Sequence, residues 1–368
     1  MFFDIITYMK GLITAGGRGT RLRPITHTKN KHLIPVAGKP IIVYAIETLK
    51  EAGIIDIGIT YNADLDTLQS FLKNGEDFGV NLVYIHQKEP IGLADCIRVS
   101  KDFLKDDSFV FFLGDNLLAG GILKYKKIFE EKKPQSLLLL SKVQDPQRFG
   151  VPEFDKAGKI VKIEEKPESP KSDFAITGIY FYDSTIFKAF EGKNHIVPSE
   201  RGELEISDVH QYLIDHGYTV LGENITGWWK DTGKPNDLLF ANRLILEKHT
   251  EYSISESAFI DDLSSISGNI SVGDNSKIIN SIIRGPVYIG NNTIIENSYI
   301  GPFTSIGNNN SLVLSEIEHS LLLDNISIFN IQQRIDESII GDNVIISKKE
   351  SKPAVYNLYL GDHSIIKI

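Results

Sequence analysis

Residues 11–46 contain six Lys or Arg side chains and neither Asp nor Glu, although the whole chain has a formal net charge of -9. Within this segment, a short apolar run ends in the glycine-rich turn GGRGTR at residues 16–21. Glycines let backbone N–H groups approach phosphate oxygens closely, and arginine and lysine add charge and forked hydrogen bonds. The segment therefore predicts a loop that binds a polyanion, and a nucleoside triphosphate is the ligand that fits it.

This loop differs from the two common phosphate-binding motifs. A Walker loop ends in Gly-Lys-Ser/Thr, and a dinucleotide-binding fingerprint needs a third glycine where this chain has Leu22. Further along, Lys31 stands just before the apolar residues 33–36. The alternative is a tight turn with solvated charges, which the absence of acidic residues disfavours.

Two aspartates in glycine-flanked positions are candidates for a metal site. Asp115 follows the apolar run 109–113, and Asp231 stands between Trp228-Trp229-Lys230 and Thr232-Gly233. Carboxylates hold Mg²⁺ in phosphoryl and nucleotidyl transfer, where the metal offsets charge on the phosphates. Each aspartate alone could equally be a helix cap or a turn residue. Together with the triphosphate loop, the pair favours Mg²⁺ binding.

Short apolar runs alternate with helical patterns up to about residue 245. We expect strands at 11–15, 55–61, 82–86, 109–113, 137–143 and 178–182, and helices at 40–52, 65–78, 91–103 and 121–131. This alternation predicts an α/β fold with a Rossmann-like, mostly parallel sheet. Ligands bind beyond the carboxyl ends of such strands, which is where the glycine turn and residues 114–116 fall.

Beyond about residue 252 the pattern changes to a hexapeptide repeat. An aliphatic residue recurs about every six positions, and Val-Gly or Ile-Gly pairs begin at residues 272, 289, 300, 306 and 340. Such a repeat predicts a left-handed parallel β-helix of about five coils, with the aliphatic side chains inside. The register slips near 284–286 and 316–334, so we expect irregular coils there.

Length and composition set the domain organisation and exclude some classes of protein. A chain of 368 residues predicts two domains. We expect an N-terminal extension at 1–8, a catalytic domain at 9–250, the β-helix at 251–350 and a C-terminal tail at 351–368. The acidic charge disfavours nucleic-acid binding, and no apolar run is long enough to span a membrane. The lone Cys96 and the absence of a signal-peptide pattern favour the cytoplasm.

Several motifs together resemble the sugar-1-phosphate nucleotidyltransferases. They are GGRGTRLRPIT at 16–26, KHLIPV at 31–36, Gln87 with PIGLA at 90–94, GDN at 114–116, EEKP at 164–167, TGIY at 177–180, RGELEISD at 201–208 and WKDTG at 229–233. The match runs in order from residue 10 to about 347 and is most similar to the long form that carries a hexapeptide domain. In that branch, the resemblance implies Mg²⁺-dependent transfer of a nucleotidyl group from dTTP to glucose 1-phosphate, which gives dTDP-glucose and pyrophosphate.

The resemblance also implies roles for individual residues. The catalytic residues would be Arg21, Lys31, Asp115, Lys166 and Asp231, with Asp115 and Asp231 carrying Mg²⁺. The nucleotide would be held by Ala15, Gly16, Gly17, Gly19, Thr20, Arg21, Gln87 and Gly92. The sugar phosphate would be held by Asn116, Gly150, Glu165, Lys166, Gly178, Arg201 and Trp229. For Lys166 and Glu165 the alternative is a surface ion pair, worth about 0 to 1 kcal/mol.

Gln87 bears on the choice of base. Its side chain offers an acceptor and two donors, which match N3–H and O4 of a pyrimidine, so Gln87 with backbone near Gly92 predicts dTTP or UTP. The alternative is an exposed loop residue without a role. Packing around one methyl separates thymine from uracil by only about 1 to 3 kcal/mol, so a UTP-using enzyme acting on glucose or N-acetylglucosamine 1-phosphate stays open. Phe149 stands where relatives commonly have tyrosine, so a hydroxyl contact is expected to be missing.

Two rival functions remain open. Some β-helix enzymes transfer acetyl groups with a histidine base, and His319 is the only histidine within the hexapeptide repeats. A structural role, in which the β-helix builds a homo-oligomer, is the preferred interpretation. A non-catalytic homologue would share the two-domain layout but carry a degraded loop, and the intact Arg21, Lys31, Asp115 and Asp231 argue against it.

Overall fold

The computed structural model describes the chain apart from residues 1–7, 64, 249–252, 349–357, 359 and 368. Residues 1–7 of the expected N-terminal extension, and residues 351–357, 359 and 368 of the expected tail, lie outside the described residues. The chain folds into two compact units. The first comprises residues 1–18 and 41–231, and the second comprises residues 19–40 and 232–368. The glycine turn therefore contributes residues to both units.

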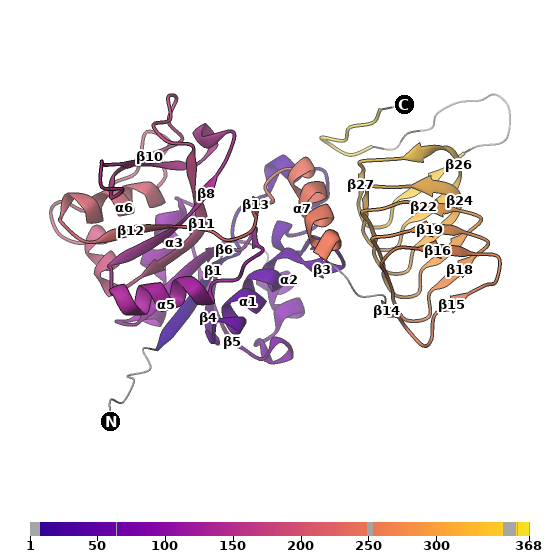
Figure 1. Ribbon diagram of the computed structural model, residues 1–368, viewed down its shortest axis with the longest axis horizontal. Helices are drawn as coiled ribbons and strands as arrows, with labels where there is room; N and C mark the ends of the chain where they lie inside the picture. Colours follow the sequence, from indigo (N-terminus) through magenta and orange to yellow (C-terminus); the bar gives the residue numbers. More distant parts are fainter. Residues whose placement is uncertain (1–7, 64, 249–252, 349–357, 359, 368) are drawn as a thin grey trace. The chain divides into compact units, whose positions relative to one another are not determined.

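The first unit is built around a seven-stranded sheet (Figure 1). In spatial order its strands are β12 (Val220–Asn224), β8 (Ser136–Lys142), β11 (Phe174–Tyr182), β6 (Ser108–Leu113), β1 (Met9–Thr14), β4 (Asp56–Tyr61) and β5 (Asn81–His86). All neighbouring pairs are parallel except those of β11, which runs antiparallel to β6 and β8. The Rossmann-like, mostly parallel sheet predicted from the sequence is confirmed.

Six α-helices connect the strands of the first unit. They are α1 (Ile41–Glu51), α2 (Leu65–Leu72), α3 (Leu93–Val99), α4 (Lys101–Leu104), α5 (Leu123–Lys132) and α6 (Ile206–Asp215). Two expected helices are shorter than predicted. The helix expected at 65–78 ends at Leu72, because the next residue, Lys73, adopts a left-handed φ of 50°. A separate 3-10 turn follows at Glu76–Phe78. The helix expected at 91–103 is divided at Ser100 into α3 and α4.

Helices cover both faces of the sheet, as the contacts of strand β11 show. Neighbouring side chains on a strand point to opposite faces. The ring of Tyr180 lies 5.3 Å from the imidazole of His210 on α6, whereas Phe181 lies 5.8 Å from Phe129 on α5. Because both faces are buried, the inner strands are apolar throughout, as in the run FVFF of β6.

Two short ribbons project from this sheet. Strands β7 (Asn116–Leu118) and β13 (Trp229–Asp231) form one antiparallel pair. Strands β9 (Gly150–Phe154) and β10 (Ile160–Glu165) form the other. They carry several of the candidate residues.

The second unit contains the parallel β-helix (Figure 1). Among the described residues, six strands stack on one face: β14 (Ser253–Ile254), β17 (Ile270–Val272), β20 (Val287–Ile289), β23 (Thr304–Ile306), β25 (Leu321–Leu322) and β27 (Ile339–Ile340). The other faces carry β15 (Phe259–Ile260), β16 (Ser265–Ser267), β18 (Lys277–Ile279), β19 (Ile282–Arg284), β21 (Ile294–Glu296), β22 (Tyr299–Ile300), β24 (Ser311–Ile317), β26 (Ser327–Ile335) and β28 (Ile345–Ser347). The predicted left-handed β-helix is confirmed, with six strands on one face where about five coils were expected.

The hexapeptide motif has separate physical reasons for its aliphatic, glycine and asparagine positions. Ile278, Ile295 and Leu312 pair with one another from coil to coil and are fully buried. A Cβ at Gly290 would lie 2.7 Å from the Gly307 carbonyl of the next coil, so the close stacking requires glycine there. Asn292 turns the corner with a left-handed φ of 54°, a conformation that asparagine tolerates well.

One of the two expected slips appears in the pairing of the coils. Strands β24 and β26 are longer than their neighbours, and their pairing shifts between Ser315 and Ile317, within the region 316–334 where the sequence pattern slips. At 284–286 the pairing stays in register, because Arg284 pairs with Ser267 and Val287 with Ile270 at the same spacing.

The rest of the second unit consists of the segment 19–40 and helix α7 (Pro235–Lys248). Segment 19–40 forms the 3-10 turns η1 (Thr20–Leu22), η2 (Ile25–His27) and η3 (Lys31–Leu33), then a hairpin of β2 (Pro35–Val36) and β3 (Lys39–Pro40). In the described part of the chain, none of the helices combines the length and apolar character that crossing a membrane requires.

Neighbouring isoleucines on β21 allow a test of the β-helix core. Ile295 is fully buried, whereas Ile294 is 38% exposed. Ile295→Ala should lower the free energy of unfolding of the β-helix by about 2 to 5 kcal/mol, because it leaves a cavity. Ile294→Ala should cost about 0.5 kcal/mol or less. Hydrogen exchange of the β-helix amides in the full-length protein measures both, and equal losses in the two variants would contradict this account of the core.

Candidate functional site

The carboxyl ends of four parallel strands bring candidate residues from distant parts of the sequence to one edge of the sheet. Just beyond the strands, the N–H of Ala15 donates to a carbonyl of β4 at 2.8 Å. The N–H of Gln87 donates to β4 at 2.8 Å, and that of Gly114 donates to β1 at 3.1 Å. These bonds continue the parallel ladders by one residue, so the glycine turn, Gln87 and the GDN segment lie side by side.

Asn62 also lies at this edge, and sequence reasoning did not identify it. Its side-chain carbonyl accepts a 3.4 Å hydrogen bond from the N–H of Gly17, whose φ is 98°. A Cβ added at Gly16 would lie 3.6 Å from the same amide. Asn62 directly follows strand β4, and a polar residue directly after a parallel strand is the signal that could have revealed it.

Gln87 is buried directly after β5, the edge strand of the sheet. The side chain is only 4% exposed, so the alternative of an exposed loop residue is wrong. Its Nε2 donates to the Gly92 carbonyl at 3.1 Å and to the Asp95 carboxylate at 3.0 Å. Gly92 has a φ of 120°, and a Cβ there would lie 2.3 Å from the carbonyl of Leu204. Glycine is therefore required at position 92, because the backbone of Leu204 packs directly against it.

The β7–β13 ribbon brings the two candidate metal ligands together. Asp231 pairs with Asn116, the residue directly after Asp115. The Asn116 side chain is held at both ends, because it donates to Asp115 Oδ1 at 2.9 Å and accepts from Trp229 Nε1 at 2.6 Å. The ring of Phe149 contacts the Trp229 ring edge-on, with centroids 5.3 Å apart. The aromatic ring at position 149 therefore supports the ribbon even without a tyrosine hydroxyl.

Gly178 lies on β11 beneath this ribbon. A Cβ at this position would lie 2.8 Å from Asn116 Oδ1 and 2.7 Å from the Leu113 side chain. Glycine therefore leaves room for the Asn116 amide, and its role here is steric.

A second group of candidates gathers around Glu165, at the end of β10. Gly150 pairs with Glu165 across the β9–β10 ribbon, and a Cβ there would lie 3.4 Å from the carboxylate. Lys166 Nζ lies 3.1 Å from Glu165 Oε1, and Arg201 Nη2 lies 3.9 Å from the same oxygen. The Ser207 hydroxyl donates to the other oxygen at 2.5 Å. The ion pair expected as the alternative for Lys166 does form, but within a larger cluster.

Glu205 and Asp208 extend the negative charge of this cluster. Arg201 forms an ion pair with Glu205 at 2.8 Å, and Glu205 is buried. Partial burial, together with the charges of Glu205 and Glu165, raises the pKa of Asp208 above its usual value. Neither acidic residue stood out as a site residue in the sequence. Their position in the motif RGELEISD, at the start of α6, is the signal that could have identified them.

The remaining part of the glycine turn belongs to the second compact unit. Gly19 has a left-handed φ of 56°, and its carbonyl accepts from the Thr26 hydroxyl at 2.7 Å. Arg21 lies within η1, which follows directly. Lys31 is the first residue of η3, which Asn30 caps by accepting from the backbone N–H of His32 at 2.9 Å. Arg21 and Lys31 are thus held in ordered turns of segment 19–40.

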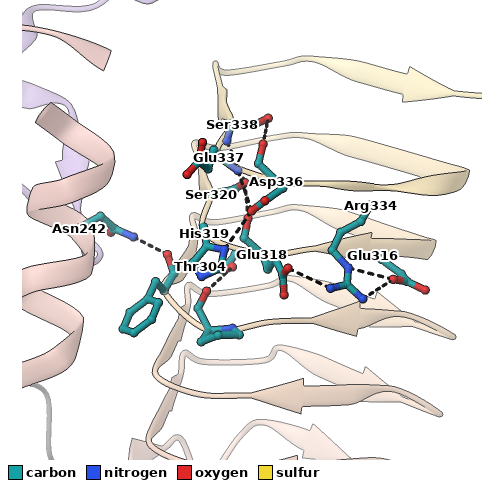
Figure 2. A network of polar contacts seen from close by, with 12 residues as sticks. Asn242, Thr304, Glu316, Glu318, His319, Ser320, Arg334, Asp336, Glu337 and Ser338 are labelled. Atoms are coloured by element: carbon teal, nitrogen blue, oxygen red, sulfur yellow. Dashed lines mark hydrogen bonds and ion pairs between the residues drawn. The ribbon is translucent and has the colours of Figure 1, made fainter. Parts of the chain in front are cut away.

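Asn242 of α7 joins this segment to the β-helix. Its Oδ1 accepts from the N–H of Ala37 at 2.9 Å and from the Ser305 hydroxyl at 2.7 Å. Its Nδ2 donates to the carbonyl of Phe303 at 2.9 Å, as Figure 2 shows. One buried amide therefore connects the β2–β3 hairpin, helix α7 and the β-helix around strand β23.

Two further contacts attach the same segment to the β-helix. Lys29 forms an ion pair with Asp342 at 2.8 Å. A Cβ at Gly38, in the turn of the β2–β3 hairpin, would lie 2.1 Å from the ring of Tyr288 on β20, so glycine permits this close approach. The β-helix therefore supports residues 29–38 directly.

His319, the candidate base for acetyl transfer, lies at a corner of the β-helix. Its Nδ1 lies 2.9 Å from Asp336 Oδ1 (Figure 2). Its ring stacks on that of Phe303, with centroids 5.7 Å apart. The neighbouring carboxylate of Glu318 is paired with Arg334 at 2.9 Å. A histidine–carboxylate pair is compatible with a base, so acetyl transfer stays the alternative to the structural role that we predict for the β-helix.

Comparison with known proteins identifies the family. Residues 10–248 match the family model described as nucleotidyl transferase. A glucose-1-phosphate thymidylyltransferase of Streptomyces griseus is 42% identical over 360 residues, which cover 98% of this chain and 99% of that protein. The chain belongs to the nucleotidyl transferase family, and the predicted similarity to sugar-1-phosphate nucleotidyltransferases is confirmed.

Two further relatives differ in how much of this chain they cover. The low-salt glycan biosynthesis nucleotidyltransferase Agl11 of Haloferax volcanii is 40% identical and covers 98% of this chain and 100% of its own length. A crystal structure from Bacillus anthracis, described as a putative glucose-1-phosphate thymidylyltransferase in complex with sucrose, is 42% identical with a TM-score of 0.60. It covers 64% of this chain and 94% of its own. The long form thus has full-length relatives, and shorter ones share part of the chain.

The Asn242 contacts can be tested against an exposed asparagine on the same helix. Asn242→Ala should lower the free energy of unfolding by about 1 to 3 kcal/mol, because it leaves a buried N–H and a buried carbonyl without their partner. Asn236→Ala, at an exposed position in the first turn of α7, is the control and should change stability by less than about 0.5 kcal/mol. Calorimetric unfolding of both full-length variants measures the difference, and equal stability would show that the Asn242 amide contributes nothing.

Proposed function

We propose that this enzyme transfers a thymidylyl group from dTTP to glucose 1-phosphate and releases pyrophosphate and dTDP-glucose. The observation that carries the proposal is the similarity over nearly the whole chain to a protein named for this activity. The positions of Gln87 and Asp115 at the carboxyl edge of the mostly parallel sheet, with Asp231 on the ribbon strand that pairs with residues 116–118, support it.

The triphosphate is proposed to bind the glycine turn. Backbone N–H groups of Gly16, Gly19 and Thr20 face the phosphates, with Arg21 on the β- and γ-phosphates. Gly17, whose N–H donates to Asn62, shapes the turn around them. Ala15 lies beside the nucleoside. Lys31 offsets the charge that builds up on the α-phosphate during transfer. The positive φ values of Gly17 and Gly19 support this proposal, because they are typical of turns that expose successive N–H groups.

The sugar phosphate is proposed to bind the cluster around Glu165. Lys166 and Arg201 contact the phosphate, and the Glu165 carboxylate accepts from sugar hydroxyls. The Asn116 amide and the backbone at Gly150 and Gly178 provide the remaining polar contacts, and Trp229 orients Asn116. Because Lys166 and Arg201 already share the Glu165 carboxylate, an incoming phosphate adds negative charge between two cations that are close to one another.

The chemistry of the donor set fits a divalent cation at Asp115 and Asp231. Their strands pair so that Asp231 lies opposite the neighbour of Asp115, and two adjacent carboxylates are typical Mg²⁺ ligands. We propose Mg²⁺ as the cofactor. When bound, it would offset negative charge on the phosphates.

The reaction needs no protein nucleophile. An oxygen of the sugar phosphate attacks the α-phosphorus and forms a new P–O bond, while the bond to the β-phosphate breaks and pyrophosphate leaves with its electron pair. No general base is needed, because the second pKa of a phosphate monoester is about 6 and the attacking oxygen is already ionised at neutral pH. Catalysis is then positioning by Lys166 and Arg201 and charge stabilisation by Arg21 and Lys31.

The remaining expectations from the sequence stay predictions. We place the catalytic domain at 9–250 and the β-helix at 251–350, with the protein in the cytoplasm and a homo-oligomer formed through the β-helix. The contacts of Asn242 and Lys29 add a role for the β-helix that does not depend on oligomerisation, namely support of segment 19–40.

A matrix of four nucleoside triphosphates against four sugar 1-phosphates tests the proposed function. The triphosphates are dTTP, UTP, CTP and GTP, and the sugars are glucose, galactose, mannose and N-acetylglucosamine. We expect the highest kcat/KM for pyrophosphate release with dTTP and glucose 1-phosphate. A higher value with UTP would assign the alternative uridylyltransferase, and no release with any pair would refute nucleotidyl transfer.

Asp231→Asn tests the metal site. The substitution should lower kcat by roughly 10²-fold or more while leaving the fold intact, because it removes one charge from the proposed Mg²⁺ ligands. A titration of activity with Mg²⁺ should show a higher requirement in the variant. Asp102→Asn, on the exposed side of α4, is the control. A near-normal rate of Asp231→Asn at limiting Mg²⁺ would remove this residue from the metal site.

A further inference from the structure

We propose that Asp95 is a positioning residue that fixes the amide of Gln87 in one orientation, so that this site accepts only pyrimidines with an N–H at position 3. The inference rests on the proposed function, since it concerns the same nucleotide site. It goes further in assigning the choice between thymine or uracil and cytosine to a residue that does not itself contact the base.

The first step is the use of both amide hydrogens of Gln87. A glutamine Nε2 carries two hydrogens. One is directed to the Gly92 carbonyl at 3.1 Å and the other to Asp95 Oδ2 at 3.0 Å. Both partners are oxygens that accept, so turning the amide over would place Oε1 against two acceptors. The Gln87 amide is therefore held with its nitrogen toward residues 92 and 95.

The second step is the charge and burial of the contacts around Asp95. Asp95 is 2% exposed and lies in the first turn of α3. Arg98, one turn further along this helix, donates to the other carboxylate oxygen from Nε at 2.8 Å and from Nη2 at 2.5 Å. One carboxylate thus joins a cation on one side to the Gln87 amide on the other. Burial strengthens this contact, because water does not compete for the same groups.

The third step concerns the hydrogen-bonding group that the Gln87 side chain still offers to the base. With both hydrogens occupied, Gln87 offers only Oε1, an acceptor. Thymine and uracil have a donor at N3, whereas the N3 of cytosine is an acceptor. The sequence interpretation, in which Gln87 both accepts from N3–H and donates to O4, is therefore narrowed: Gln87 accepts, and the base carbonyl must find its donor elsewhere, as in the backbone near Gly92.

Asp95→Asn tests this orientation, because an asparagine can present either an N–H or a carbonyl to Gln87. When that asparagine presents its N–H, the Gln87 amide can turn over at the cost of the Gly92 contact alone, and it then offers a donor to cytosine N3. We expect the ratio of kcat/KM for UTP over CTP, each with glucose 1-phosphate, to fall by about tenfold or more. The ratio of dTTP over UTP should stay unchanged, since those two bases share N3–H.

Two additional variants keep the result interpretable. Asp102→Asn, exposed on the following helix, should leave the UTP over CTP ratio at the wild-type value. Arg98→Gln removes the half-exposed partner of Asp95 and should shift the ratio in the same direction by a smaller factor, which allows the test even if Asp95→Asn does not fold. A merely structural role for Asp95 would lower activity with every nucleotide alike.

The outcomes separate this inference from the proposed function. If wild-type protein releases pyrophosphate but Asp95→Asn, or Arg98→Gln where the first does not fold, keeps the wild-type UTP over CTP ratio, the role of Asp95 is refuted and nucleotidyl transfer stands. If wild-type protein is inactive with all four triphosphates, the proposed function fails and the inference fails with it.

Discussion

The parallel pairing of β1 with β4 on one side and β6 on the other is the constraint on which the site depends. Parallel neighbours end at the same edge of a sheet, so this pairing places the start of the glycine turn between Asn62 and the GDN segment. Residues 100 positions apart, such as Thr14 and Gly114, therefore become neighbours.

Several candidate side chains are held in place by hydrogen bonds from neighbouring side chains. Trp229 holds the amide of Asn116, Ser207 binds one oxygen of Glu165, and Asp95 binds the amide of Gln87. An amide or carboxylate that is already oriented needs little reorganisation when charge moves in the reaction. These hydrogen bonds fix the orientation of the Asn116, Glu165 and Gln87 side chains before a substrate binds.

The basic segment belongs to the second unit and is held by contacts of its own. Residues 19–40 pack with α7 and the β-helix, through the Asn242 amide and the Lys29–Asp342 ion pair. An appended repeat domain is easily regarded as an assembly device alone. Here, its coils provide contacts that hold the segment in which Arg21 and Lys31 lie.

The sequence by itself determined the periodic and local features: the alternating sheet, the hexapeptide coils and the glycine turn. These depend on short-range patterns of apolar residues, glycine and asparagine. Only the tertiary structure decided which side chains meet. The sequence analysis assigned no role to Asn62, Asp95, Ser207 or Asn242, and they matter because folding places one polar atom within hydrogen-bond reach of another. Such pairing depends on three-dimensional distance, which no local pattern encodes.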